Sequence, residues 1–196
     1  FLLCLIPINF CLSQQEFSEN KTEKQLYNFN AFKSGEKLEY RLNYGFFNAS
    51  YASLTLKDEV LDGKKVLRAT SIGRTTGLAR LFFKVDDIYE TFFPKEKVKP
   101  VKSIRDIYEG GYEREAETIY DYKNNKALFY DKLKNIKKEF DIHPDIQDII
   151  STFYYLRKHF DISSLKPNDL IYVDIFFDKE IYPFKMMFLG IERIKT

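Results

Sequence analysis

Apolar and polar residues alternate along most of the chain, and this alternation predicts a fold made mainly of strands. Between Leu38 and Tyr44 every second side chain is apolar, as in a strand with one buried face. Asp62 and Gly63 both tolerate positive φ, so they predict a hairpin turn. The alternation breaks between residues 75 and 83, where we expect a short helix. Further strands are predicted over residues 52–56, 65–72, 85–93, 101–108, 170–177 and 182–189.

A second hairpin is predicted between residues 112 and 133. Asparagine accepts left-handed backbone geometry better than most residues, so a two-residue loop is expected at Asn124 and Asn125. Lys123 then pairs with Lys126. This register also places glutamates opposite lysines on one face: Glu117 opposite Lys132, and Glu115 opposite Lys134. A glutamate row by itself would indicate a cation site, but the opposed lysines predict a solvated, charge-paired face.

One segment shows helical periodicity instead, and we expect a helix over residues 144–160. Pro144 suits the first turn, and Asp145 adds negative charge where the helix dipole favours it. Lys158 and His159 suit the negative pole at the other end. The apolar positions of the helix form one stripe: Ile146, Ile149, Ile150, Phe153 and Tyr154.

These elements predict a mainly β protein. We expect a curved antiparallel sheet or an open barrel, with the helix at about 144–160 packed on it. Residues 32–196 form a single predicted domain, which is long enough to bury a sizeable core. Residues 14–31 are polar and are expected to form a flexible leader in front of it.

The first residues predict export. Residues 1–13 are mostly apolar and end in the small residue Ser13, a pattern typical of a signal peptide and too short for a membrane span. We therefore expect cleavage after Ser13 and a soluble periplasmic protein. The alternatives are an extracellular location or a lipid anchor on Cys11, although bulky Phe10 precedes that cysteine. The missing initiator Met and the strand pattern that stops at Thr196 predict that both ends of the sequence are incomplete.

Composition narrows the chemistry further. Cys4 and Cys11 both lie in the expected signal peptide, so the mature domain would have no disulfide and no thiol nucleophile. The 31 basic and 29 acidic residues give a net charge of +2. Such a balance gives no electrostatic reason to expect nucleic acid or an acidic membrane as a partner. Aromatic residues are abundant, with 19 Phe and 14 Tyr, and suit the surfaces of a sheet.

No catalytic, cofactor or metal residue is predicted. His143 and His159 would stand about 24 Å apart at opposite ends of the helix, so capping and dipole roles explain them better than a metal site. Ser151 lies within the helix and has no plausible general base. Asp86 and Asp87 are adjacent in a strand and should point to opposite faces. The sequence also lacks a nucleophile elbow, a phosphate loop and a dinucleotide fingerprint.

Arg157 continues the apolar stripe of the helix and should lie at the edge of the buried face. A carboxylate from a strand would be its natural partner, and Glu90, Asp106 and Glu109 are the candidates. The alternative is an arginine whose stem is buried while its guanidinium stays in water.

Three segments together resemble a known family. They are Gly35 to Tyr40 with Tyr44-Gly45, then Val85 to Thr91 with Pro100 and Arg105 to Tyr112, and the helix from Asp148 to Arg157. In them the chain is similar to an exported bacterial family known as domain of unknown function 3108. Asn48-Ala49-Ser50 departs from the expected Ala-Gly at one turn. The resemblance implies a β-rich envelope protein, usually longer at its C-terminus, and implies no activity.

The leading functional hypothesis is a non-catalytic envelope protein that binds an apolar or extended ligand, such as a lipid, a peptide or a glycan. An apolar cavity under the stripe from Ile146 to Tyr154 would favour it. The alternatives are a hydrolase-like envelope enzyme with carboxylates from distant strands, and a purely structural scaffold. Ligand-binding residues are not assigned by the sequence.

Overall fold

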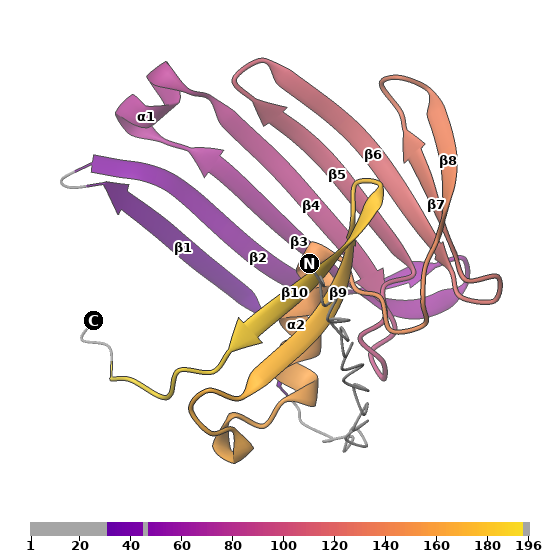
Figure 1. The fold of residues 1–196 in the computed structure, drawn as a ribbon. Helices are drawn as coiled ribbons and strands as arrows, with labels where there is room; N and C mark the ends of the chain where they lie inside the picture. Colours follow the sequence, from indigo (N-terminus) through magenta and orange to yellow (C-terminus); the bar gives the residue numbers. More distant parts are fainter. Residues whose placement is uncertain (1–30, 45–46, 194–196) are drawn as a thin grey trace, which may run out of the picture.

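A computed structural model describes residues 31–44 and 47–193, with the side chains of residues 43–48 left aside. Eight strands form one antiparallel sheet in which each strand pairs with the next along the chain (Figure 1). These strands are β1 (Lys37–Tyr44), β2 (Phe47–Leu61), β3 (Lys64–Thr75), β4 (Val85–Phe93), β5 (Lys102–Glu109), β6 (Tyr112–Asp121), β7 (Lys126–Asp131) and β8 (Ile136–Asp141).

The rest of the described chain is short helices and a separate hairpin. Helix α1 (Gly77–Phe82) connects β3 to β4. Helix α2 (Ile149–His159) is followed by the 3₁₀ helix η1 (Ile162–Ser164) and the two-stranded sheet of β9 (Leu170–Phe177) and β10 (Glu180–Met187). The mainly β prediction is confirmed, and so is the short helix between β3 and β4.

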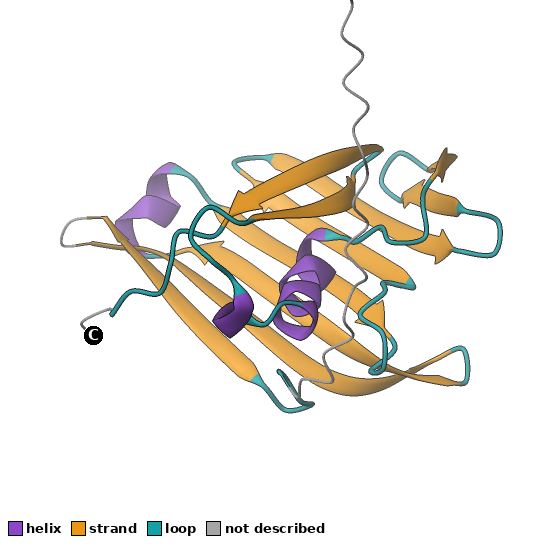
Figure 2. Ribbon diagram, turned by 60° about the horizontal axis from the view of Figure 1, so that its bottom comes forward, coloured by secondary structure: helices purple, strands orange, loops and turns teal. Residues whose placement is uncertain are grey.

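The large sheet is curved and open. In the described part of the chain β1 and β8 are its edges, so it is not a closed barrel. Figure 2 shows α2 and the β9–β10 hairpin on the same face of this sheet. The predicted curved antiparallel sheet with one helix packed on it is therefore confirmed.

Aromatic rings join α2 to the sheet. Tyr154 is fully buried. The centroid of its ring lies 5.0 Å from that of Phe32 and 5.5 Å from that of Phe93. The buried core around it draws on β2, β3, β4, α2 and β9: Leu54, Leu56, Leu67, Ala69, Phe93, Val98, Tyr154, Tyr155, Val173 and Ile175. Burial of large apolar side chains is the main favourable term in folding. The predicted apolar stripe thus covers a filled core rather than a cavity.

The predicted start of the helix was wrong. Pro144 lies in a turn, and the helix begins after Asp148, whose carboxylate accepts the Ser151 amide hydrogen bond at 2.7 Å. The Ser151 hydroxyl oxygen accepts from the Asp148 amide at 2.8 Å, which completes a capping box. Ahead of the helix the chain is extended, because Gln147 forms a parallel bridge with Ile175 of β9. Pairing with a distant strand therefore delays the helix.

The register of the β6–β7 hairpin was also wrong. Asp121 pairs with Lys126, so the turn has four residues rather than two. The Asp121 carboxylate accepts hydrogen bonds from the Lys123 and Asn124 amides, which stabilises the longer turn. Asn125 adopts a positive φ of 54°, as its residue type predicts.

The charge pairing predicted for this hairpin is present only in part, because the partner of Glu115 is Lys132 and not Lys134. Glu117 lies opposite Tyr130, yet Lys132 reaches Glu115 at 2.8 Å and Glu117 at 4.0 Å. Strand β8 was not predicted, since its consecutive charged residues Lys137, Lys138 and Glu139 hide the alternation.

Candidate ligand-binding cavity

An apolar cavity of about 480 Å³ lies at the C-terminal end of α2, where η1 and the β9–β10 hairpin meet it. Its volume falls within the range of small-molecule sites. Seven apolar side chains supply most of the lining: Leu156, Phe160, Ile162, Leu165, Ile171, Met186 and Phe188. Ala31, Arg157 and Asp161 complete it.

Local structure explains how these side chains converge. Leu156 and Phe160 are four residues apart and therefore share one side of the helix end. Asp161 then caps η1 by accepting the Ser163 amide at 2.9 Å, which redirects the chain. On the facing hairpin Ile171 lies directly opposite Met186, so both point to the same face. The cavity is thus formed by elements that each turn an apolar side toward a shared space.

Arg157 closes the cavity toward the sheet. Its guanidinium forms two hydrogen bonds to the Glu36 carboxylate, at 2.6 and 2.8 Å, and a third to the Ala31 carbonyl at 2.5 Å. The ring of Phe153 lies 5.0 Å from the same guanidinium. The hydrogen bonds that Arg157 donates to Glu36 raise the pKa of Arg157 above its ordinary value. The two side chains are 27% and 18% exposed, so this bidentate ion pair is partly shielded from water.

The partner predicted for Arg157 was therefore wrong. Glu90 instead accepts hydrogen bonds from Arg68 and from the Thr70 hydroxyl, while Asp106 and Glu109 are exposed. The alternative of a solvated guanidinium is wrong as well. Glu36 lies 121 residues from Arg157 in sequence, and nothing in the local pattern connects them.

The opposite end of α2 encloses only a small polar cavity of about 30 Å³. This space suits one water molecule and has no room for an organic ligand. Asp148 lies there, fully buried, and accepts a hydrogen bond of 2.5 Å from the Thr91 hydroxyl. Burial raises the pKa of Asp148 to about 6 despite its hydrogen bonds. A buried carboxyl group with a raised pKa is a catalytic candidate in principle, but here it caps a helix.

The other carboxylates around this polar cavity are paired with arginines. Glu90 is paired with Arg68, and Asp178 with both Arg105 and Arg114. Their charges are therefore compensated, and no pair of free acids faces a common space here. The cavity offers a buried polar network rather than an acid–base pair.

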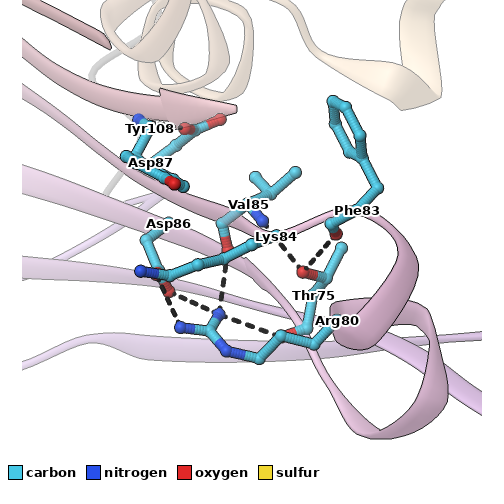
Figure 3. Close-up of polar contacts among 8 residues, drawn as sticks. All are labelled: Thr75, Arg80, Phe83, Lys84, Val85, Asp86, Asp87 and Tyr108. Carbon is cyan, nitrogen blue, oxygen red and sulfur yellow. Dashed lines mark hydrogen bonds and ion pairs between the residues drawn. The ribbon is translucent and has the colours of Figure 1, made fainter. Parts of the chain in front are cut away.

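Asp86 and Asp87 point to opposite faces of β4, as predicted. Asp86 receives two hydrogen bonds of 2.7 Å from Arg80 (Figure 3). Asp87 accepts the Tyr108 amide at 3.2 Å, and burial together with the charge of Glu109 raises its pKa to about 6. The two carboxyl groups cannot act as a dyad.

The predicted placement of the two histidines at opposite ends of one helix was wrong, because His143 precedes α2 and lines a hollow with Tyr155, the residue on which the His159 ring stacks. His143 lies 2.9 Å from a carboxylate oxygen of Asp174, and His159 lies 3.0 Å from the Tyr155 carbonyl with its ring stacked on that tyrosine. Among the described residues no group of three or more potential metal ligands occurs. The cysteines and the predicted signal peptide lie outside the described residues.

Family membership rests on a match that spans most of the chain. The family model described as a protein of unknown function, DUF3108, matches residues 39–196. The chain belongs to this family. The DUF3108 match includes α2, η1 and the β9–β10 hairpin, and hence nearly the whole cavity, whereas Ala31 and Glu36 precede it. No curated protein and no solved structure matches the chain. No helix in the described ranges is long and apolar enough to cross a membrane.

Sequence analysis missed the cavity because its lining is not periodic. Residues 156–165 carry apolar side chains at irregular spacing, which favours neither a helix nor a strand. A cluster of apolar residues in an apparent loop is unusual, and this was the one available signal. The expected cavity under the helical stripe is absent from the described core, and the observed one lies beyond the stripe's end.

Proposed function

We propose that this DUF3108 protein is a non-catalytic binding protein whose cavity at the end of α2 takes an apolar ligand, such as the acyl chain of a lipid. The observation that carries the proposal is the cavity itself, with its volume of about 480 Å³ and its mostly apolar lining. Apolar pockets of this size with few polar groups are common ligand sites.

The charges at the cavity indicate a ligand whose inserted part is uncharged. Arg157 is neutralised by Glu36, and three of the five N–H donors of its guanidinium are already used in hydrogen bonds. A ligand carboxylate would have to compete with Glu36 for this guanidinium, and displacing Glu36 would leave a partly buried charge unpaired. Asp161 also lines the cavity, and its negative charge disfavours an anionic group inside, so the carboxylate of a fatty acid would stay in the solvent while its acyl chain is inserted.

We also propose that the protein is exported and acts in the periplasm. The support is the apolar run at residues 1–13, which is typical of a signal peptide. Fractionation of cells followed by N-terminal sequencing tests this, with a mature chain near Gln14 in the periplasm expected. The intact leader in the cytoplasm would contradict it.

Ligand binding is tested by filling the mouth of the cavity. Ile162 is 58% exposed, so Ile162→Trp adds bulk there without disturbing the core. We expect at least about a tenfold loss of affinity for a fluorescent fatty acid, equivalent to about 1.4 kcal/mol. Ile136→Trp, at a surface position of β8, is the matched control and should bind as the unmodified protein does.

Mass spectrometry of the gently extracted protein gives an independent measurement. Lipid that co-purifies with the unmodified chain and with Ile136→Trp, but not with Ile162→Trp, is the expected result. Equal recovery from all three variants, or no binding of the fatty acid by any, would overturn the proposal.

A further inference from the structure

A second surface, far from the cavity, presents apolar side chains to solvent. Figure 1 shows α1 at the end of the sheet, away from α2. No residue of α1 is buried. Leu81 is 80% exposed and Phe82 is 88% exposed, and their neighbours Leu78 and Phe83 are each more than half exposed. A contiguous exposed apolar group of this kind marks an interaction site more often than a defect of packing.

Polar contacts hold this apolar tip firmly in place. Arg80 forms two hydrogen bonds of 2.7 Å to Asp86 and reaches the Thr75 and Val85 carbonyls (Figure 3). The Thr75 hydroxyl donates to the Phe83 carbonyl and accepts the Val85 amide hydrogen bond, both at 2.9 Å. These contacts tie the residues before α1 to the residues that follow it. The exposed apolar side chains are therefore displayed by a fixed loop rather than left over from a frayed helix.

A cationic groove of about 520 Å³ adjoins the tip. Arg41 of β1 and Arg74 of β3 line it, with Tyr51 of β2 between them in the same cross-strand row. Gly77, the first residue of α1, lines it too, so groove and tip are continuous. Within residues 31–44 and 47–193 neither arginine has a carboxylate within 4.0 Å, in contrast to Arg80, Arg105, Arg114 and Arg157.

Apolar side chains beside two arginines that have no direct ion pair match one kind of surface, although the charge of Glu39 acts on Arg41. Leucine and phenylalanine enter the boundary between lipid headgroups and acyl chains, while arginine binds phosphate. We propose that the α1 tip docks on an anionic lipid bilayer, with Leu81 and Phe82 inserted and with Arg41 and Arg74 on the headgroups. The near-neutral net charge of the whole chain does not reveal the local pair of Arg41 and Arg74. The docking surface is separate from the ligand cavity and does not depend on it.

The chain contains no tryptophan, so a single one reports on its own site. In Phe82→Trp, we expect the emission to shift to the blue with phosphatidylglycerol vesicles and to be quenched by nitroxide-labelled lipid. With phosphatidylcholine vesicles the shift should be small. Leu133→Trp, in the exposed β7–β8 turn, is the control reporter and should not respond. Because the signal comes from residue 82, membrane binding by another segment does not produce it.

The arginines are tested in the Phe82→Trp background. Arg41→Gln and Arg74→Gln should each raise the lipid concentration for half-maximal shift about fivefold, the effect expected for one basic residue at an anionic surface. Lys134→Gln, in the same turn as the control reporter, should leave it unchanged. Three results would overturn the proposal: no shift at residue 82, an equal shift with neutral vesicles, or a shift that needs no vesicles and grows with protein concentration, as for a second copy.

Discussion

The two ends of α2 meet the same sheet and hairpin, but they are built in opposite ways. At the N-terminal end a capping box and the Thr91 hydroxyl satisfy the Asp148 carboxylate, and the remaining space suits one water. At the C-terminal end apolar side chains leave about 480 Å³ unfilled. A buried carboxylate must be satisfied by nearby donors, whereas apolar walls tolerate an empty space or an apolar guest. The N-terminal end therefore fixes the position of the helix, whereas the C-terminal end has space for a ligand.

The largest expected effect comes from breaking the ion pair beside the cavity. Glu36→Gln leaves the partly buried Arg157 charge without its carboxylate, so the free energy of unfolding should fall by about 3 kcal/mol. Urea denaturation measures it. The double variant Glu36→Gln with Arg157→Met removes both charges and should recover part of the loss. A single variant as stable as the unmodified protein would show that the pair is dispensable.

The N-terminal end should contribute strongly to the pH dependence. The pKa of Asp148 is raised to about 6 in the folded state, above its ordinary 3.8, so the folded protein binds the proton more tightly. Stability should therefore fall as the pH rises from about 4 to about 6, by up to about 3 kcal/mol.

The test of this pH dependence is Asp148→Asn, which keeps a capping side chain but cannot ionise. Its thermal unfolding should depend less on pH across that window than that of the unmodified protein. Some dependence should remain, because the pKa of Asp87 is also raised to about 6. Identical pH profiles would contradict the assignment.

A smaller effect is expected at the hydroxyl that donates to Asp148. Thr91→Val keeps the shape of a fully buried side chain and removes the donor, which should lower the unfolding free energy by about 1–2 kcal/mol at pH 7. At pH 4 the carboxyl group is protonated and the loss should be smaller. A loss that does not change with pH would point to packing instead.

The smallest effect is expected at the mouth of the cavity. Ile162→Ala removes a side chain that is 58% exposed, so stability should change by less than about 0.5 kcal/mol. Binding of a fatty acid should weaken measurably by fluorescence titration. A large loss of stability with unchanged binding would mean that this end is part of the core, and the contrast between the two ends would fail.

Sequence analysis predicted the elements whose evidence is local. Alternation located most of the strands, because the burial of one face of a strand repeats every second residue. Asp62 and Asn125 adopt the positive φ expected of their residue types. The opposite orientation of Asp86 and Asp87 likewise follows from strand geometry alone.

The tertiary structure decided where elements meet, and with that the candidate sites. The helix starts at Asp148 because Gln147 pairs with Ile175, a strand partner that no local pattern specifies. Arg157 pairs with Glu36 across 121 residues, and the cavity exists only where η1 approaches β9 and β10. The periodic spacing of apolar residues predicts which side chains are buried, but it does not predict which distant side chains they contact. For this protein the sequence thus determined the strands and the family, while long-range packing determined the cavity.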